Sequence, residues 1–280
     1  MIFTTYLTKG GIPLNAIGVD AGGSLVKISY EEKGKLHTKT YPVEEIFACI
    51  NWLQILSPDA ILKLTGGKSA LIQSLVEQKI KLVDEFQATV TGTRYVLKTE
   101  KQSTPDQFIQ VHIGTGTSIF YVTPDFYERL LGTGIGGGTF IGLGKLISGK
   151  ENFNELNELA GQGNSHQSDL LIRDIYAPSP SPLLGSLTAS NFGKANLNKD
   201  AATADHIASL VRMIGETLVL LATQTAAAHQ LKNIVFTGST LDGNQPLKEL
   251  IASFQDILDF NPIFLEKGAY VGAIGALLDR

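Results

Sequence analysis

Four segments of the sequence combine glycines with hydroxyl or charged residues, a composition that could bind phosphate. One such segment is Asp20-Ala21-Gly22-Gly23-Ser24-Leu25-Val26-Lys27. Glycines lack a Cβ, so backbone N–H groups there can approach anionic oxygens. Ser24 adds a donor, Lys27 adds a positive charge, and Asp20 could hold Mg²⁺ directly or through water. The Gly-Lys-Ser/Thr ending of a Walker A loop is missing, and an ordinary hairpin turn is the alternative.

Three further glycine clusters have a similar character. Gly114-Thr115-Gly116-Thr117-Ser118 has more hydroxyls than a turn needs, although it could be a polar bulge. Gly132-Thr133-Gly134-Ile135-Gly136-Gly137-Gly138 runs into an apolar segment that is expected to be a helix, which would aim a helix N-terminus at phosphate. Its GxGxxG match does not indicate a dinucleotide site, because that fingerprint belongs near the start of a βαβ unit. Gly238-Ser239 follows the last predicted strand and is weak alone.

Two charged side chains could act on a substrate. Glu85 follows an apolar strand and starts a predicted helix, so its carboxylate could accept a hydroxyl proton. The alternative is an acid that complements the helix dipole. Arg129 precedes the third glycine cluster and could bind a substrate carboxylate with its planar guanidinium. The alternative is a solvated charge at a strand end.

The elements that position these residues repeat. A strand, a Gly and Ser/Thr turn and a returning strand are expected at 16–30 and again at 109–122, each followed by a third strand and helical material. We therefore predict two α/β halves, 1–105 and 106–280, that face a cleft; two unrelated hairpins are the alternative. Apolar spacing predicts helices over 43–56, 203–230 and 268–278, among others.

Composition excludes several classes of protein. Hydrophobic residues make up 43% of the 280 residues, enough for a large core. The net charge of -4 disfavours a dedicated nucleic-acid binder. The single cysteine, Cys49, excludes an internal disulfide framework, and a chain without disulfides suits a reducing cytoplasm. Cys49 is expected to lie in the core. No targeting segment and no membrane span are expected, and the five histidines show no metal-ligand spacing.

The motifs together resemble those of type II pantothenate kinases, which belong to the actin/hexokinase/Hsp70-like superfamily. The resemblance covers nearly the whole chain after about residue 15. Its most specific parts are Val83-Asp84-Glu85-Phe86 and Leu187-Thr188-Ala189-Ser190-Asn191-Phe192-Gly193. It implies duplicated actin-like ATPase domains, which are ribonuclease H-like, flanking a nucleotide cleft. It also implies ATP-dependent phosphorylation of pantothenate, the first step of coenzyme A synthesis.

The resemblance also assigns roles to individual residues. Glu85 takes the position of the general base, Arg129 that of the arginine that grips the pantothenate carboxylate, and Thr188 is assigned to the substrate. Residues expected to bind ATP are Asp20 to Lys27, Thr115, Gly137, Gly138, Thr139, Phe140, Ile141, Phe153 and Ser239. Mg²⁺ is expected at Asp20. The family packs as dimers on a long helix, so 203–230 is the expected homodimer interface.

Two departures and two alternatives remain. Gln87 stands where the family usually has Asp, and Leu131 where it usually has Gly, which bears on the base and on the pantothenate pocket. A sugar or amino-sugar kinase of the same superfamily is one alternative, and a non-catalytic actin-like ATPase is the other. A dehydratase activator shares the ATP fold, but one cysteine supplies too few thiolates for its iron-sulfur cluster.

Overall fold

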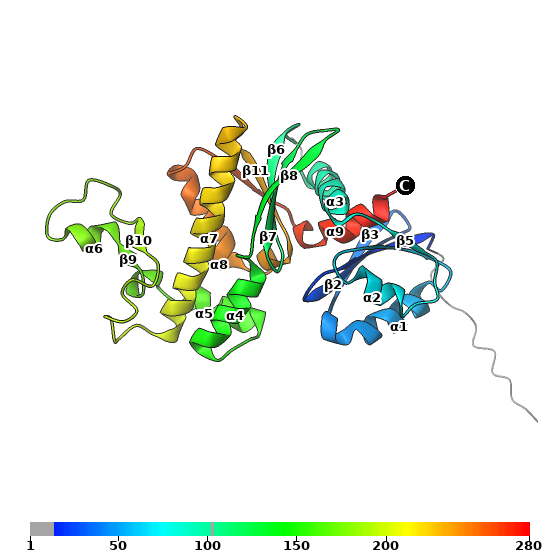
Figure 1. Cartoon of the computed structure of the whole chain (residues 1–280), viewed down its shortest axis with the longest axis horizontal. Helices are drawn as coiled ribbons and strands as arrows, with labels where there is room; N and C mark the ends of the chain where they lie inside the picture. The colour runs from blue at the N-terminus through cyan, green and yellow to red at the C-terminus, as the bar shows by residue number, and fades with distance from the viewer. Residues whose placement is uncertain (1–13, 102–103) are drawn as a thin grey trace, which may run out of the picture. The chain divides into compact units, whose positions relative to one another are not determined.

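The computed structural model describes residues 14–101 and 104–280 (Figure 1). Its contacts divide the chain into two compact units. Unit 1 holds the described residues up to 99 together with 270–280, and unit 2 holds residues 100–269. The division predicted from the sequence, 1–105 and 106–280, differs at the C-terminal end. The last helix belongs to unit 1 because its small residues pack against the first strand.

Unit 1 is built on a five-stranded sheet with the order β3-β2-β1-β4-β5. Its strands are β1 (Ala16–Ala21), β2 (Leu25–Glu32), β3 (Lys35–Pro42), β4 (Ile61–Thr65) and β5 (Ile80–Leu82). The first three form an antiparallel meander, and β4 and β5 join β1 in parallel. The centre of the sheet is buried, which explains the continuous apolar run of β1.

Unit 2 repeats this topology with the order β12-β11-β6-β7-β8. Its strands are β6 (Phe108–Ile113), β7 (Thr117–Val122), β8 (Tyr127–Thr133), β11 (Asn233–Thr237) and β12 (Asn261–Phe264). Here too the first three are antiparallel and the last two are parallel additions beside the first. The predicted repeat is therefore confirmed. The sequence analysis missed β12, whose short apolar run is interrupted by Pro262.

The helices of unit 1 are α1 (Ile46–Leu56), α2 (Ser69–Gln73), α3 (Glu85–Glu100) and α9 (Val271–Leu278). Helix α1 buries Ile46, Cys49, Ile50 and Leu53, which share one face at helical spacing. Burial raises the pKa of the Cys49 thiol to about 11, so this cysteine is a core residue, as predicted. Helix α9 begins at Val271, after a 3₁₀ turn at Gly268–Tyr270, where the sequence predicts one continuous helix.

Glycines let α9 lie close to both β1 and α3, and Figure 1 shows α3 and α9 next to each other. A Cβ on Gly18 of β1 would lie 2.0 Å from the Ala273 carbonyl oxygen. A Cβ on Gly275 would lie 1.7 Å from the Ala88 carbonyl oxygen of α3. Both distances are impossible for real atoms, so only glycine permits this packing. The ammonium of Lys63 on β4 donates to the Leu277 carbonyl at 2.8 Å and satisfies the end of α9.

The main helices of unit 2 are α4 (Gly137–Ser148), α5 (Phe153–Gln162), α7 (Thr203–Ala228) and α8 (Gln245–Ser253). Helix α4 begins at Gly137, inside the third glycine cluster of the sequence. By length and composition α7 could cross a membrane, but half of its most apolar window is buried. That buried face packs in the core with β6, α4, α5 and α8, the arrangement of a core helix.

A small subdomain of unit 2 adjoins the N-terminal half of α7. It contains α6 (Ile172–Tyr176) and the two-stranded sheet of β9 (Leu170–Leu171) and β10 (Thr188–Ser190). Figure 1 shows this subdomain projecting beside α7. Pro178, Pro180 and Pro182 lie in the loop that connects α6 to β10, and this loop is mostly exposed.

Candidate functional site

An ion pair in unit 1 joins the end of β1 to the start of β2. Asp20 and Lys27 are directly opposite in the antiparallel ladder, and Lys27 Nζ lies 3.2 Å from Asp20 Oδ2. Their side chains are only 11% and 7% exposed. The turn between them is closed by the Gly22 N–H, which donates to the Leu25 carbonyl at 3.0 Å. The segment is a hairpin turn, and its ends carry one buried charge of each sign.

Two glycines leave room for the Asp20 carboxylate. A Cβ on Gly66, after β4, would lie 2.8 Å from Asp20 Oδ1, and a Cβ on Gly272 of α9 would lie 2.7 Å from Asp20 Oδ2. Gly66 also has a φ of +88°, a backbone conformation that residues other than glycine rarely adopt. The physical role of both glycines is to surround this carboxylate with backbone.

Glu85 is the first residue of α3. Asp84 caps the helix: its Oδ1 accepts the Gln87 N–H at 2.8 Å, and its carbonyl accepts the Ala88 N–H. Glu85 is an exposed residue, yet its pKa is raised above the usual 4.5. Desolvation by surrounding protein is the main cause, and the negative charges of Asp20 and Asp84 add to it while Lys27 opposes it. A carboxylate with a raised pKa is a better base near neutral pH.

Gln87, the first departure from the family pattern, lies one turn into α3. Its Nε2 donates to Thr91 Oγ1 at 3.0 Å, so the amide is held along the helix.

Three loops of unit 2 converge on Gly114, at the end of β6. The Gly114 carbonyl accepts from the Gly137 N–H at 2.8 Å and from Thr240 Oγ1 at 2.8 Å, and the Thr115 carbonyl accepts from the Gly138 N–H at 2.9 Å. The turn after β6, the start of α4 and the 3₁₀ turn at Ser239–Leu241 therefore form one structure. This arrangement unites three of the four glycine clusters that the sequence singled out.

Close packing explains the glycines in these loops. A Cβ on Gly137 would lie 2.4 Å from Thr240 Oγ1, and a Cβ on Gly238, where φ is +106°, would lie 2.2 Å from the Ile113 carbonyl. Thr139 fixes the entry to α4: its Oγ1 donates to the Gly134 carbonyl at 2.8 Å and accepts the Gly136 N–H at 3.3 Å. The helix N-terminus behind this loop has the dipole and N–H groups that favour anions.

The other residues predicted to bind nucleotide lie on α4, on α5, in the 3₁₀ turn after β11 and in the turn after β6. Phe140, in the first turn of α4, is buried, and its ring meets that of Phe153 edge-on with centroids 5.6 Å apart. Phe153 is the first residue of α5. Ser239 begins the 3₁₀ turn. Thr115 and Ile141 are at least partly accessible.

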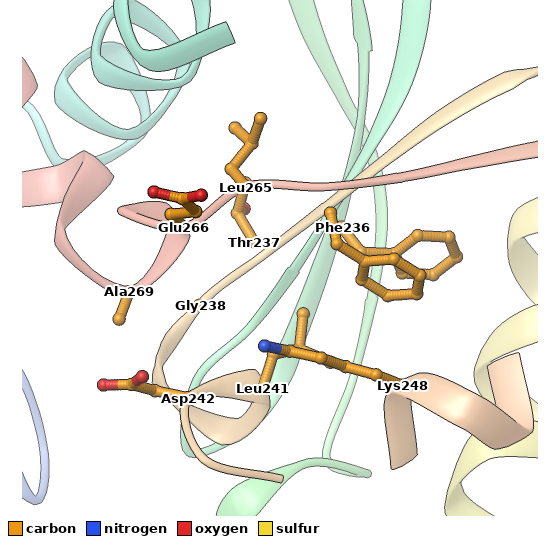
Figure 2. Close-up of a pocket in the computed structure, with 11 residues that line it drawn as sticks. Phe236, Thr237, Gly238, Leu241, Asp242, Lys248, Leu265, Glu266 and Ala269 are labelled. Atoms are coloured by element: carbon orange, nitrogen blue, oxygen red, sulfur yellow. The ribbon is translucent and has the colours of Figure 1, made fainter. Parts of the chain in front are cut away.

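A small cavity lies behind the Gly238 turn. Lys248 of α8, Asp242 and Glu266 are among its lining residues, as Figure 2 shows. Its volume of about 10 Å³ is close to the space that one water needs. It is far too small for a nucleotide.

Arg129 lies on β8 of unit 2. Its Nε donates to Ser118 Oγ on β7 at 3.2 Å. A Cβ on Gly132 would lie only 2.1 Å from Arg129 Nη2, so glycine leaves room for the guanidinium. The guanidinium is exposed and could meet a carboxylate. Leu131, the second departure, is partly buried against the apolar core of unit 2 and so serves packing.

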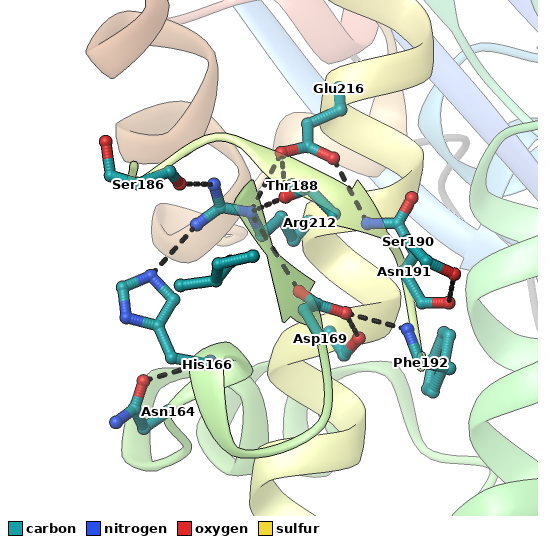
Figure 3. Close-up of polar contacts among 12 residues, drawn as sticks. Asn164, His166, Asp169, Ser186, Thr188, Ser190, Asn191, Phe192, Arg212 and Glu216 are labelled. Atoms are coloured by element: carbon teal, nitrogen blue, oxygen red, sulfur yellow. Dashed lines mark hydrogen bonds and ion pairs between the residues drawn. The ribbon is translucent and has the colours of Figure 1, made fainter. Parts of the chain in front are cut away.

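Thr188 is part of a polar network between β10 and α7 (Figure 3). Its hydroxyl donates to Glu216 Oε1 at 2.6 Å and accepts from Arg212 Nε at 2.7 Å. Arg212 and Glu216, one turn apart on α7, also pair directly at 2.8 Å. Asn191 Nδ2 donates to Glu216 Oε2 at 3.1 Å. The structure thus gives Thr188 two structural partners.

Asp169 is the buried end of this network. Its Oδ1 accepts from Ser209 Oγ and from the Phe192 N–H, while Arg212 Nε lies 3.9 Å from Oδ2. Burial raises the pKa of Asp169. Sequence reasoning missed Asp169, Arg212 and Glu216. The available signal was an Arg and a Glu at i, i+4 inside an otherwise apolar helix.

A magnesium site built by protein alone is not present: residues 14–101 and 104–280 hold no group of three or more His, Cys, Asp or Glu that could ligate a metal. Mg²⁺ at kinase sites, however, usually keeps several waters and uses one or two carboxylates plus substrate phosphates. Asp20, a carboxylate beside a glycine turn, fits that mode of binding.

Sequence comparison identifies close relatives. The model of the Fumble family matches residues 16–279. The type II pantothenate kinase of Oceanobacillus iheyensis is 43% identical over 95% of this chain and 99% of that protein. The enzyme of the same name from Bacillus cereus strain ATCC 14579 is 40% identical over 94% and 97%.

Solved structures show the fold. Component A of the (R)-2-hydroxyglutaryl-CoA dehydratase of Acidaminococcus fermentans has a TM-score of 0.63 at 15% identity, with 94% of this chain and 96% of that chain covered. A ROK-family glucokinase of Streptomyces griseus, in complex with glucose and AMPPNP, has a TM-score of 0.54 at 14% identity, with 94% and 97% covered. These similarities confirm the predicted class, a duplicated actin/hexokinase-like α/β fold.

Proposed function

Because the chain belongs to the Fumble family and is 40–43% identical to type II pantothenate kinases over nearly its whole length, we propose that it is a pantothenate kinase. It transfers the γ-phosphoryl group of ATP to the primary hydroxyl of pantothenate, the first step of coenzyme A synthesis. The observation that supports this most directly is Glu85, a carboxylate of raised pKa whose charge interacts with Asp20 and Lys27 at the phosphate-binding turn.

Glu85 is the general base. It accepts the proton of the pantothenate hydroxyl as the oxygen attacks the γ-phosphorus. A new O–P bond forms, the bond from the γ-phosphorus to the β,γ-bridging oxygen breaks, and ADP leaves. The raised pKa of Glu85 favours this proton transfer because the base is then closer in pKa to the operating pH. Asp84 holds the helix terminus that carries Glu85.

The nucleotide phosphates bind the glycine turns. The residues assigned to this role in unit 1 are Asp20 to Lys27, with Lys27 as the cation. Those assigned to it in unit 2 are Thr115 and the start of α4, Gly137 to Ile141. Phe153 and Ser239 contact the rest of the nucleotide. Asp20 would hold Mg²⁺ directly or through water, and the ion would neutralise charge on the phosphate oxygens.

Arg129 binds the pantothenate carboxylate. The Arg129 side chain is exposed, Ser118 Oγ accepts from its Nε, and a planar guanidinium matches a carboxylate in geometry and charge. Thr188 is also assigned to the pantothenate site, and its bonds to Arg212 and Glu216 hold its hydroxyl in place.

The protein is a cytoplasmic homodimer in this proposal. A second copy packs on the outer face of α7. The apolar side chain of Leu220 is 52% exposed on this helix. Sedimentation equilibrium should give a dimer mass, and Leu220→Glu should shift it toward the monomer. A wild-type chain that stays monomeric at micromolar concentration would contradict this part.

A coupled assay for ADP tests the function. ATP would be offered with pantothenate, pantetheine, glucose and N-acetylmannosamine in parallel. ADP formation that depends on pantothenate supports the proposal. Turnover with a sugar but none with pantothenate would favour a sugar kinase, and ATP hydrolysis without any acceptor would favour an actin-like ATPase.

A further inference from the structure

Asn157 is a buried amide without hydrogen bonds. The residue is 7% exposed, and neither Oδ1 nor Nδ2 has a partner. Across the described parts of the chain, it is the one residue whose carbonyl oxygen and amide nitrogen both lack one. An unpaired buried polar group is costly, and native structures usually provide it with a partner such as a ligand or water. Asn157 therefore requires an explanation.

Asn157 lies beside a groove of unit 2. The groove has a volume of about 460 Å³ and runs between α5 and the start of α8. One face of α5 provides Asn154, Asn157, Glu158 and Gly161, which follow helical spacing. The loop before α8 and its first turns provide Gly243, Gln245, Pro246 and Glu249. A groove of this size accommodates an aromatic heterocycle.

The groove adjoins the loops that the proposed function assigns to nucleotide. Phe153, whose ring contacts Phe140 of α4, lies one turn before Asn157 on the same side of α5. On the other side, Gly243 lies three residues after Thr240, whose hydroxyl bonds the Gly114 carbonyl. Both walls of the groove thus lead back to the glycine loops at Gly114 and Gly137.

We propose that Asn157 reads the purine base of ATP in this groove. The inference rests on the proposed function. Asn157 is then the residue that distinguishes adenine from purines without the 6-amino group. The amide turns from the groove wall toward the base as the nucleotide enters. Its Oδ1 then accepts from the 6-amino group of adenine, and its Nδ2 donates to the neighbouring ring nitrogen.

The chemistry of the lining favours a base over phosphate. Glu158 and Glu249 place carboxylates at the groove and would repel an anion. An asparagine amide offers one donor and one acceptor side by side, which matches the adjacent donor and acceptor of adenine, as in the Asn–adenine pairs of protein–DNA complexes. Engagement of both atoms also removes the unpaired state that Asn157 has in the structure.

Nucleotide binding by calorimetry tests the inference without any use of pantothenate. The probes are ADP and purine riboside 5′-diphosphate, which lacks only the 6-amino group. The wild-type chain should prefer ADP by about tenfold or more, the size expected for a recognised hydrogen bond. N157A should bind ADP about tenfold more weakly and lose the preference. N154A is the matched control, because Asn154 lines the same groove, and it should keep the preference.

A second variant separates recognition from folding. N157L replaces the unpaired amide with an apolar side chain of similar size, so its thermal midpoint should equal or exceed that of the wild type. Its ADP preference should nevertheless be lost. Wild-type affinity and preference in either variant at Asn157 would overturn the inference. If ADP preference depends on Asn157 but pantothenate is not phosphorylated, the inference stands while the proposed function fails.

Discussion

The carboxylate of Asp20 and the ammonium of Lys27 face each other across the β1–β2 ladder, 3.2 Å apart, at the two ends of a glycine turn. Both are almost fully buried, so each charge depends on the other. Breaking a buried pair is costly because one charge remains without a partner.

Lys27→Met should therefore lower the free energy of unfolding by about 3–5 kcal/mol, measured by urea denaturation. Lys81→Met is the control: Lys81 pairs with Asp279 at the surface, and the loss there should be about 0–1 kcal/mol. Equal losses in the two variants would contradict the importance of burial at Asp20.

Glu85→Gln should lower kcat by about 10²-fold or more, because the variant cannot accept the hydroxyl proton. KM for ATP should change little. Glu44→Gln removes an exposed acid elsewhere in unit 1 and should leave kcat unchanged. Full turnover by Glu85→Gln would remove Glu85 from the role of base.

The pH dependence of kcat/KM should carry the raised pKa of Glu85. The base acts when deprotonated, so activity should rise with pH through an apparent pKa above 4.5. Asp84→Asn keeps the helix cap but removes a charge that raises this pKa, so the acidic limb should move to lower pH. A limb that stays in place in this variant would argue against Glu85 as the titrating group.

Three glycine-to-alanine variants test the packing around α9. Gly272→Ala should displace the Asp20 carboxylate and reduce nucleotide affinity, since its Cβ would lie 2.7 Å from Oδ2. Gly275→Ala should instead lower the thermal midpoint by separating α9 from α3. Gly67→Ala has open space and should be neutral in both measurements. A neutral Gly275→Ala would show that the helices can separate freely.

Arg212→Met should destabilise unit 2 by about 3–5 kcal/mol, because Glu216 and Asp169 would keep buried charges without their cation. Glu216→Gln should cost less, since its amide oxygen can still accept from Arg212 and Thr188. Chemical denaturation gives the comparison. If both variants lose the same stability, the pairing of charges is not what holds β10 to α7.

Much of the site could be predicted from local sequence. Glycines between apolar runs predicted the hairpin turns, and strand periodicity revealed the duplication, because turn chemistry and burial patterns are encoded within a few neighbouring residues. Glu85 is a candidate base from sequence because an acid after a strand and before a helix is a local signal.

What only the tertiary structure decided depends on contacts between distant segments. The assignment of α9 to unit 1 rests on the approach of Gly18, Ala88 and Gly275, which no local pattern reveals. The bonds of Thr188 to α7 and the unpaired amide of Asn157 likewise depend on which groups burial brings together. Sequence by itself determined the turns, the repeat and the candidate chemistry, since these follow from the order of residue types. The partners of each buried polar group were decided by packing, which joins residues far apart in the chain.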